Sequence, residues 1–436
     1  MRLRRLAPAW SRAWARDSSV VLISQVSALV VTTALSVLVA RELGPSSFGV
    51  LAALQGLAQL LTIFVDAGIS TYVLRELSAI WAANDDRDGA GRAGALVSGA
   101  LTATAAAVTV LLVASSIVGA LTVEKAEHLA ALVGLVGYTS LLACADTLET
   151  VYRARRRLRL LACAIALEKT TLVALVATAV LTNGGLPAIA AGYLAAGVVR
   201  LVFDVTAVRR LGVLHWQRPT RGELGSTLRA SLPFGLSSTV PTAIVRFDAS
   251  VIGLFSTTAA GLYAVGDKVL TALLVVSSTA AATLYPLLAR ERNTISAAWR
   301  AAAGMLAGGL VIAAIGIALA PELVPAVFGH RFDGAVAPVQ LMLLAVPLIY
   351  GSSMLMVGLF SLGRETTVLR VSLPCVVAGT AFVVAGQAIF GVKGAAAGYA
   401  LRYVAFSSAM ALATARVARA RTRQDAPIDL EVPAES

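Results

Sequence analysis

Long apolar runs, separated by short polar segments, recur along almost the whole chain. Each run has about 20 residues or more, which is enough for a helix to cross the roughly 30 Å of hydrocarbon in a bilayer. The runs are continuous and lack the two-residue alternation of membrane β-strands. The pattern predicts twelve transmembrane helices, at residues 19–40, 50–73, 94–121, 129–151, 160–182, 186–208, 231–254, 261–289, 301–320, 335–361, 368–390 and 394–415.

Composition agrees with this pattern. Of the 436 residues, 58% are hydrophobic and 14% are charged, whereas charged residues make up about 25% of a typical soluble protein. The mean hydropathy is +0.81. The chain is therefore expected to be an all-α integral membrane protein.

The distribution of basic residues predicts how the helices are oriented. Most Arg and Lys residues fall in segments on the same side of the membrane as the N-terminus. The opposite loops contain only Arg41, Lys125, Arg331 and Lys393. The positive-inside rule then places both termini of this multi-pass protein in the cytoplasm. The net charge of +12 follows from this bias, so the expected partner is the lipid bilayer and not nucleic acid.

Several kinds of chemistry lack a sequence signal. Cys144, Cys163 and Cys375 lie in predicted helices without metal-ligand spacing, and the histidines are dispersed, so no metal site is expected. There is no phosphate-binding Walker stretch. The loops, such as the outer "PELVPAVFGHRFDG", are short for a catalytic domain. We therefore expect no cofactor and no enzymatic activity, and a function carried out within the membrane.

An internal repeat predicts how the helices are grouped. "LGPSSFGVLAAL" resembles "FSTTAAGLYAVG" with Gly49 aligned on Gly261, and "AIAAGYLAAG" resembles "GAAAGYALRY" at nearly the same offset. Duplication of a six-helix unit would give two parallel halves related by a pseudo-twofold axis along the membrane normal. Chance similarity between Gly- and Ala-rich hairpins is the alternative. The expected divisions are a basic cytoplasmic tail (1–18), a first half (19–208), a cytoplasmic linker (209–230), a second half (231–415) and a cytoplasmic tail (416–436).

Charged residues inside the predicted helices are the main candidates for function. Such charges are costly in lipid and usually face a bundle interior or an aqueous cavity. A cation-lined cavity suits an anionic cargo such as a lipid diphosphate. The alternative is that nearby acids (Glu168, Asp204, Asp248 and Asp267) neutralise the cations and lock helices together. The candidate cargo-binding cations are Lys169, Arg200, Arg246, Lys268 and Arg402.

Spacing along the helices refines these candidates. Arg200 and Asp204 are four residues apart and can pair on one helical face. Glu168 and Lys169 are adjacent, so their side chains should point in different directions and each should need a partner elsewhere. Arg246 lies roughly 21 Å along its helix from Leu232, past the middle of the membrane. It is the best single candidate for binding the diphosphate.

A further set of charged residues is assigned to gating or coupling. Asp66 and Arg75 lie toward the inner end of the second helix and form either an inner gate or a packing ion pair. Asp66, Asp248 and Glu168 are also candidate couplers to an ion gradient. The run "RARRRLR" at 153–159 is expected to anchor the chain at the membrane surface, and collection of an anionic headgroup is the second interpretation.

Two stretches resemble a known family. They are "LVARELGPSSFGVLAALQGLAQLLTIFVDAGISTYVLREL" and "LPFGLSSTVPTAIVRFDASVIGLFSTTAAGLYAVGDKV", and the closing "FGVKGAAAGYAL" fits the same family. The chain resembles the oligosaccharide flippases of the polysaccharide-transporter family, which belongs to the multidrug/oligosaccharidyl-lipid/polysaccharide exporter superfamily. The residues that carry the resemblance are Arg41, Leu43, Gly44, Pro45, Phe48, Gly49, Asp66, Gly68, Arg75, Pro233, Asp248, Gly261 and Tyr263.

The resemblance implies a function and partners. Members of this family move undecaprenyl-diphosphate-linked sugar units from the cytoplasmic to the outer leaflet for surface polysaccharide synthesis. The partners that the resemblance implies are a lipid-linked glycan, the bilayer, and a polysaccharide polymerase or glycosyltransferases. The implied location is a bacterial cytoplasmic membrane. Two alternatives remain, a multidrug-type cation antiporter of the same superfamily and a non-transporting scaffold for glycan-synthesis enzymes.

Overall fold

The fold is an all-helical bundle. The computed structural model describes residues 7–66, 68–82, 88–122, 125–213, 225, 229–231, 247–288 and 293–424. The first part of the bundle consists of α1 (Ala7–Asp66), α2 (Ile69–Ala82), α3 (Asp88–Thr122), α4 (Ala126–Ala154), α5 (Leu158–Leu181) and α6 (Gly185–Arg210). The second part consists of α9 (Asp248–Phe255), α10 (Thr257–Leu288), α11 (Thr294–Phe328), the 3₁₀ helix η3 (His330–Ala335), α12 (Val336–Leu343), α13 (Val346–Ser361) and α14 (Glu365–Gln424).

The expectation of twelve membrane-spanning helices is confirmed. The described residues contain 9 helices long and apolar enough to cross a membrane. Two of them, α1 and α14, each hold two predicted spans, because the backbone leaves the helical region at Gly44 (φ 72°) and at Gly391 (φ 64°). The remaining predicted span, 231–254, ends in α9, and most of its residues lie outside the described part of the chain.

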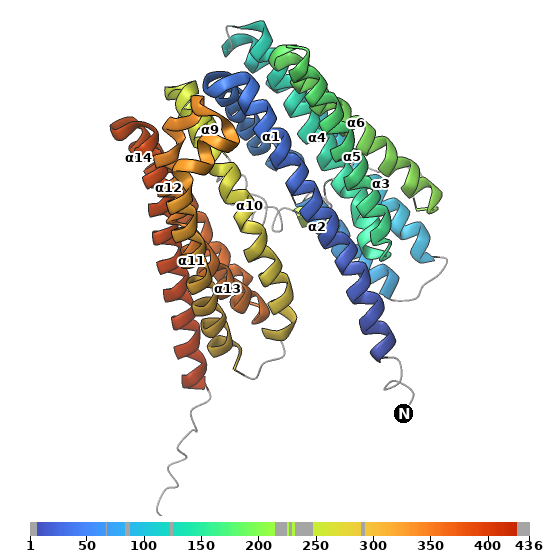
Figure 1. The fold of residues 1–436 in the computed structure, drawn as a ribbon. Coiled ribbons are helices and arrows are strands. Elements are labelled where there is room, and N and C mark those ends of the chain that lie inside the picture. The colour runs from blue at the N-terminus through green and yellow to red at the C-terminus, as the bar shows by residue number, and fades with distance from the viewer. Residues whose placement is uncertain are drawn as a thin grey trace, which may run out of the picture.

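The break at Gly44 follows from local chemistry. A positive φ is unfavourable for residues with a Cβ atom, and glycine tolerates it. Pro45 follows directly and cannot donate a backbone hydrogen bond to the preceding turn. The chain therefore reverses here, and the second half of α1 runs back alongside the first (Figure 1).

The predicted continuous helix at 50–73 is wrong in one respect. α1 ends at Asp66, Gly68 has φ 80°, and a separate helix, α2, begins at Ile69. The Asp66 carboxylate accepts hydrogen bonds from the backbone N–H of Gly68 (3.2 Å) and of Ser70 (3.3 Å), and from the Ser70 hydroxyl (2.6 Å). Asp66 thus satisfies backbone donors at the start of α2, which stabilises the break.

The region around 321–361 also differs from the expectation. The segment predicted to be an outer loop is helical, because α11 continues through Pro321 and Pro325 to Phe328 and is followed by η3. The single helix predicted at 335–361 is instead split into α12 and α13. Pro347 lies in the first turn of α13, where its missing N–H costs no helical hydrogen bond, but it cannot continue the helix from α12.

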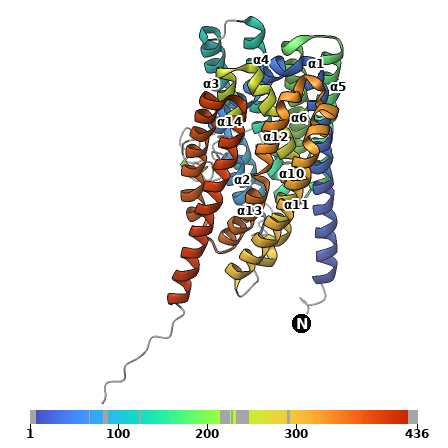
Figure 2. The same cartoon turned by 60° about the vertical axis from the view of Figure 1, so that its left-hand side comes forward.

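The bundle has two distinct ends. α1 begins and α14 finishes at the same end, which we call the termini side (Figures 1 and 2). The breaks at Gly44 and Gly391 lie at the opposite end, which we call the far side. In Figure 1 the helices of the first part (blue to green) and of the second part (yellow to red) meet at the far side. α1 provides the main contacts between the two parts, through α9, α10, α11 and η3.

Two glycines form the closest of these contacts. A Cβ atom on Gly49 would lie 1.7 Å from the carbonyl oxygen of Thr257, and one on Gly261 would lie 1.9 Å from the carbonyl oxygen of Pro45. Each glycine therefore sits directly against the backbone of the other helix. The sequence repeat aligns Gly49 with Gly261 and Pro45 with Thr257. The contact is thus reciprocal, as a twofold relation between the halves requires.

Side chains add to the closure at the far side. Arg41 donates hydrogen bonds to the carbonyl oxygens of Ala326 and Val327 (2.6 Å to Val327) at the end of α11. The hydroxyls of Ser46 and Thr257 are 3.0 Å apart. Arg41 thus binds the free carbonyls of a helix C-terminus, where a positive charge is favourable.

Candidate functional site

A cavity lies between the first and second parts of the bundle, which are called the first and second halves from here on. This central cavity is lined by many polar side chains. Its lining comes from α1, α4, α5 and α6 of the first half and from α10 of the second. The polar residues that line it are Thr32, Thr33, Ser36, Gln55, Gln59, Tyr138, Thr139, Lys169, Tyr193, Lys268 and Thr271. Two of the predicted cargo-binding cations, Lys169 and Lys268, therefore line one cavity from opposite halves.

The two lysines lie at similar depth. Lys169 precedes the far-side end of α5 at Leu181 by twelve residues, and Lys268 follows the far-side start of α10 at Thr257 by eleven. At about 1.5 Å per residue, each lies about 17 Å from that end. This distance is close to half of the roughly 30 Å hydrocarbon thickness. The lysines are thus placed near the middle of the membrane.

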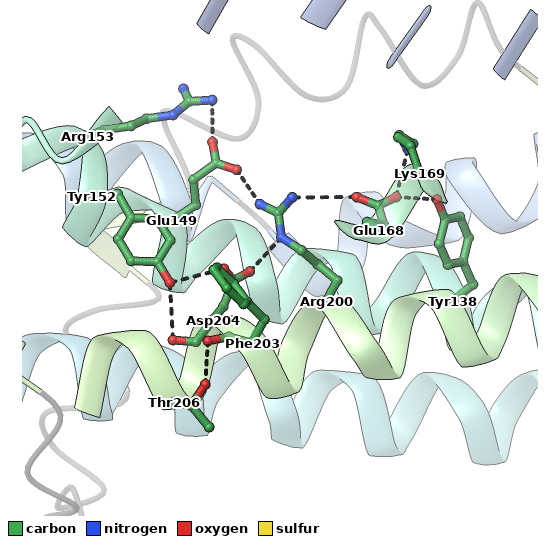
Figure 3. A network of polar contacts seen from close by, with 10 residues as sticks. All are labelled: Tyr138, Glu149, Tyr152, Arg153, Glu168, Lys169, Arg200, Phe203, Asp204 and Thr206. Atoms are coloured by element: carbon green, nitrogen blue, oxygen red, sulfur yellow. Dashed lines mark hydrogen bonds and ion pairs between the residues drawn. The ribbon is translucent and has the colours of Figure 1, made fainter. Parts of the chain in front are cut away.

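Arg200 is at the centre of a charged network in the first half (Figure 3). The Arg200 side chain is only 3% exposed. Its Nε donates to Asp204 Oδ2 (2.6 Å), its Nη2 donates to Glu149 Oε2 (2.8 Å), and its Nη1 lies 3.5 Å from Glu168 Oε2. These carboxylates come from α6, α4 and α5. The guanidinium therefore joins three helices, and every one of its nitrogens faces an acid.

The expectation that Glu168 and Lys169 point apart is wrong. Lys169 Nζ donates to Glu168 Oε1 at 2.7 Å, and the Tyr138 hydroxyl donates to the same oxygen at 2.8 Å (Figure 3). The expectation used only the angle between adjacent positions on a helix. The long lysine side chain is flexible and can bend back toward its neighbour. Glu168 thus shares its negative charge among Lys169, Arg200 and Tyr138.

Arg402 makes a corresponding pair in the second half. Its two terminal nitrogens donate to the two oxygens of Asp248, both at 2.7 Å, and Nη2 also donates to Thr380 Oγ1 (3.1 Å). The Tyr263 hydroxyl donates to Asp248 as well (3.1 Å). The two charged side chains are 1% and 2% exposed. This bidentate pair connects α14 to the start of α9.

Gly379 makes room for this arginine. A Cβ atom there would lie 2.2 Å from the Cγ atom and 2.4 Å from the Nε atom of Arg402. A larger residue at this position would displace the Arg402 side chain.

The other predicted site residues have varied positions. Arg246, the best candidate from the sequence, lies outside the described residues. Asp66 caps α2 and also lines a cavity on the termini side with Asp146, Glu149 and Arg153. Arg75 is an exposed residue of α2. The described part therefore brings together Lys169 with Glu168 and Arg200, and separately Asp248 with Arg402.

Sequence reasoning missed two acids of α4, Asp146 and Glu149. Glu149 pairs with Arg200 and with Arg153. Asp146 lines both the termini-side cavity and a neighbouring one that contains Lys169 and Arg200. Both acids fall inside the predicted helix 129–151, so the cost of a charge in a membrane helix was a signal that could have identified them. Arg153, assigned to a surface anchor, also binds this network.

The described side chains form no group of three His, Cys, Asp or Glu that could hold a metal ion. The side chains that line the described cavities include charged groups, amides, hydroxyls and aromatic rings. Two ammonium groups and several hydroxyls at the central cavity can bind an anionic, oxygen-rich group without breaking or forming a covalent bond.

The chain has the fold of several solved structures, among them transporters and a lipid flippase. A multidrug resistance MATE family transporter of the MOP superfamily, in an inward-facing conformation, is 16% identical with a TM-score of 0.70, covering 91% of this chain and 96% of that one. The lipid II flippase MurJ, in an inward closed conformation, is 11% identical with a TM-score of 0.77, covering 90% of this chain and 87% of that one. A MOP superfamily transporter from Pyrococcus furiosus is 16% identical with a TM-score of 0.62, covering 93% and 96%.

Sequence comparison gives the family. Among curated proteins, no sequence matches this chain significantly. A family model described as polysaccharide biosynthesis protein matches residues 14–291, which is more than half of the chain. The chain therefore belongs to the polysaccharide biosynthesis protein family, and it has the fold of the MOP superfamily transporters.

Proposed function

We propose that this protein is a flippase that moves polyprenyl-diphosphate-linked oligosaccharides from the cytoplasmic to the outer leaflet of a bacterial cytoplasmic membrane. The observation that carries the proposal is the position of Lys169 and Lys268, one from each half, on one mid-membrane cavity. A group that binds both lysines would couple its own movement to the movement of the halves. The protein acts on no covalent bond and is not an enzyme.

The two lysines suit a diphosphate. Each ammonium group has three donors, and Lys169 uses one of them on Glu168. The negative charge of Glu168 is already divided between Lys169, Arg200 and the Tyr138 hydroxyl. Lys169 therefore keeps donors and part of its charge for a phosphate oxygen. Lys268 lines the same cavity from α10, and Arg246 is proposed as a third cation.

Arg200 and Arg402 were candidates for binding the cargo, but we propose a structural role for both. Their guanidinium groups already bind carboxylates, and both side chains are almost fully buried. Releasing either one toward a cargo would leave acids without a counter-charge in a membrane interior, at a cost of several kcal/mol. We assign them to positioning the helices that carry the lysines.

Alternating access supplies the mechanism. With both termini in the cytoplasm, the far side is the outer surface, and the described contacts of α1 with α9, α10, α11 and η3 close it. The diphosphate enters from the cytoplasmic side and binds the lysines, and the halves then rock so that the outer contacts separate. Asp66 and Arg75, near the termini side, are the proposed inner gate.

The multidrug-type antiporter is disfavoured by the pairing of four acids within the bundle. Glu149, Glu168, Asp204 and Asp248 each bind an arginine or lysine, so these carboxylates have little charge left for a cationic drug. A scaffold without transport needs no lysines at the middle of the membrane. It would place polar groups on its outer surfaces, where a polymerase or glycosyltransferase could bind.

The test is neutralisation of the two lysines. Lys169→Gln and Lys268→Gln should each lower export of the lipid-linked glycan by about tenfold, because each removes a charged hydrogen bond to phosphate. The double variant should be near inactive. Lys125→Gln, an exposed lysine at the far-side start of α4, is the matched control and should export normally. The measurement is surface glycan per membrane-inserted protein.

Wild-type export by the double variant would refute the proposed diphosphate site. A binding measurement separates the rival transporter. Undecaprenyl diphosphate should raise the thermal stability of the purified wild-type protein, and the cation tetraphenylphosphonium should not. The opposite pattern would favour the antiporter.

A further inference from the structure

A second cavity lies within the second half and is not explained by diphosphate binding. This C-half cavity has a volume of about 320 Å³, at the lower end of the roughly 300–1,000 Å³ of small-ligand pockets. Its lining residues come from α10, α13 and α14. One part of its lining is apolar, and the other consists of Asp267, Thr271, Ser352, Ser353, Ser372, Tyr399, Arg402 and Tyr403.

The C-half cavity adjoins the central cavity across α10. Thr271 lines both of them. Lys268 lines the central cavity, and its neighbour Asp267 lines the C-half cavity. Consecutive helical residues point about 100° apart, so one helix presents an ammonium group to one space and a carboxylate to the other. Both residues also line a small pocket between the two cavities.

Asp267 differs from the other acids near this site. Asp248 is 2% exposed and is held by Arg402 and Tyr263. Asp267 is partly buried and has no hydrogen bond or ion pair with any described residue. An ionised carboxylate offers about four acceptor sites. Asp267 is therefore free, within the described part of the chain, to accept hydrogen bonds from a ligand.

The opposite wall of the cavity is aromatic. Tyr399, Tyr403 and Phe406 lie along one face of α14, with ring centroids 5.1 Å apart for the first pair and 6.3 Å for the second. The serine hydroxyls of α13 and α14 add donors and acceptors to the rim. A carboxylate, hydroxyls and aromatic faces around one space match a ring-shaped ligand with hydroxyl groups at its edge and C–H bonds on its face.

We infer that the C-half cavity binds the sugar residue attached to the diphosphate. In this arrangement Lys268 holds the diphosphate, Asp267 accepts hydrogen bonds from sugar hydroxyls, and Tyr403 packs against the face of the ring. The sugar and its diphosphate are adjacent in the cargo, as the two cavities are adjacent on α10. The inference rests on the proposed flippase function and adds to it the site at which the protein recognises the glycan.

Other occupants fit this cavity less well. A polyprenyl chain would match only the apolar part of the lining, because against Asp267 and the serines it would displace water without replacing the hydrogen bonds. An organic cation would suit a carboxylate beside aromatic rings. However, Lys268 lines a pocket together with Asp267, and its ammonium group would repel a positive ligand.

The experiment compares two lipids on the full-length protein in nanodiscs. One is undecaprenyl diphosphate without sugar, and the other is the lipid-linked glycan extracted from source cells that lack this protein, in which unexported cargo accumulates. We expect the wild-type protein to bind the glycan-bearing lipid about tenfold more tightly. Asp267→Asn should remove this difference and leave affinity for undecaprenyl diphosphate unchanged, whereas Lys268→Gln should weaken both.

Two further variants keep the result interpretable. Tyr403→Leu removes the aromatic face without touching a charge and should also reduce the glycan-dependent increment. Asp333→Asn, an exposed acid of η3, is the matched control and should bind both lipids like the wild type. Thermal unfolding checks that each variant is folded.

Each outcome has a defined meaning. Equal wild-type affinity for the two lipids, or an equal loss for both in Asp267→Asn, would overturn the sugar subsite and leave the flippase proposal in place. Binding of neither lipid by the wild type would overturn both. Tetraphenylphosphonium binding that depends on Asp267 would identify the cavity as a cation site instead.

Discussion

At the scale of single residues, arginine and lysine occupy different environments in this interior. Arg200 and Arg402 bind carboxylates through most of their nitrogens and are almost fully buried. Lys169 and Lys268 line the central cavity. The planar, forked guanidinium matches two carboxylate oxygens at fixed geometry, whereas the ammonium group sits on a flexible chain and can change partners. The difference favours arginine for holding helices and lysine for a passing cargo.

The Arg402–Asp248 pair provides a prediction about stability. Arg402→Gln should leave Asp248 buried without its counter-charge and lower stability by about 3–5 kcal/mol. The double variant Arg402→Gln with Asp248→Asn should recover most of this loss, because it leaves no isolated charge. The measurement is thermal unfolding of the purified variants, together with their abundance in the membrane. A well-folded Arg402→Gln protein that fails only in transport would instead place Arg402 on the cargo path.

At the scale of helices, breaks and close contacts are placed by glycine and proline. Gly44 and Gly391 allow the reversals within α1 and α14, and Pro347 separates α12 from α13. Gly49 and Gly261 let α1 and α10 meet backbone to backbone. The atoms nearest to each glycine belong to the backbone of the other helix, so a larger residue cannot be accommodated by a side-chain rotation.

The Gly49 contact provides a prediction about the closed far side. Gly49→Leu should prevent the close approach of α1 to α10, because even a Cβ atom would lie 1.7 Å from a carbonyl oxygen. Gly304→Leu is the matched control, because a Cβ atom at Gly304 has open space. The measurement is cross-linking between cysteines placed at Ser46 and Thr257, whose hydroxyls are 3.0 Å apart, after Cys144, Cys163 and Cys375 are replaced by alanine.

We expect efficient cross-linking in the otherwise unchanged protein and in Gly304→Leu, and a several-fold loss in Gly49→Leu. Undiminished cross-linking in Gly49→Leu would mean that the two helices do not need this contact to close.

At the scale of the whole molecule, the arrangement of the described helices agrees with an even number of spans. α1 begins and α14 finishes on the same side. The basic residues predict that this side is cytoplasmic. A reporter fused after Asn84 or Arg157 should therefore be active in the cytoplasm, and one fused after Lys125 or His330 should be active outside.

The measurement is a paired reporter assay, with one enzyme active only in the cytoplasm and one active only outside. Reversed results at any two of these sites would defeat the twelve-span topology. Reversal at all four would make the closed far side the inner surface.

The sequence alone determined the number of membrane-spanning segments and most of the charges that lie within them. These properties depend on local composition, because a helix of about 20 apolar residues satisfies its own backbone and partitions into lipid whatever its neighbours are. Local sequence also identified the break at Gly44. It identified the embedded cations too, of which Arg246 lies outside the described residues. The Arg200–Asp204 pair, four residues apart, was also within reach of helical geometry.

Only the tertiary structure decided which charges meet. Arg402 binds Asp248 from 154 residues away, and Arg200 binds Glu149 from 51 residues away. Such pairs depend on how helices rotate and pack, and helical periodicity along one segment does not determine this. The sequence does not distinguish the embedded cations from one another, because each of them lies in an apolar helical segment. Their partners in neighbouring helices decide which hold the bundle and which line its cavity.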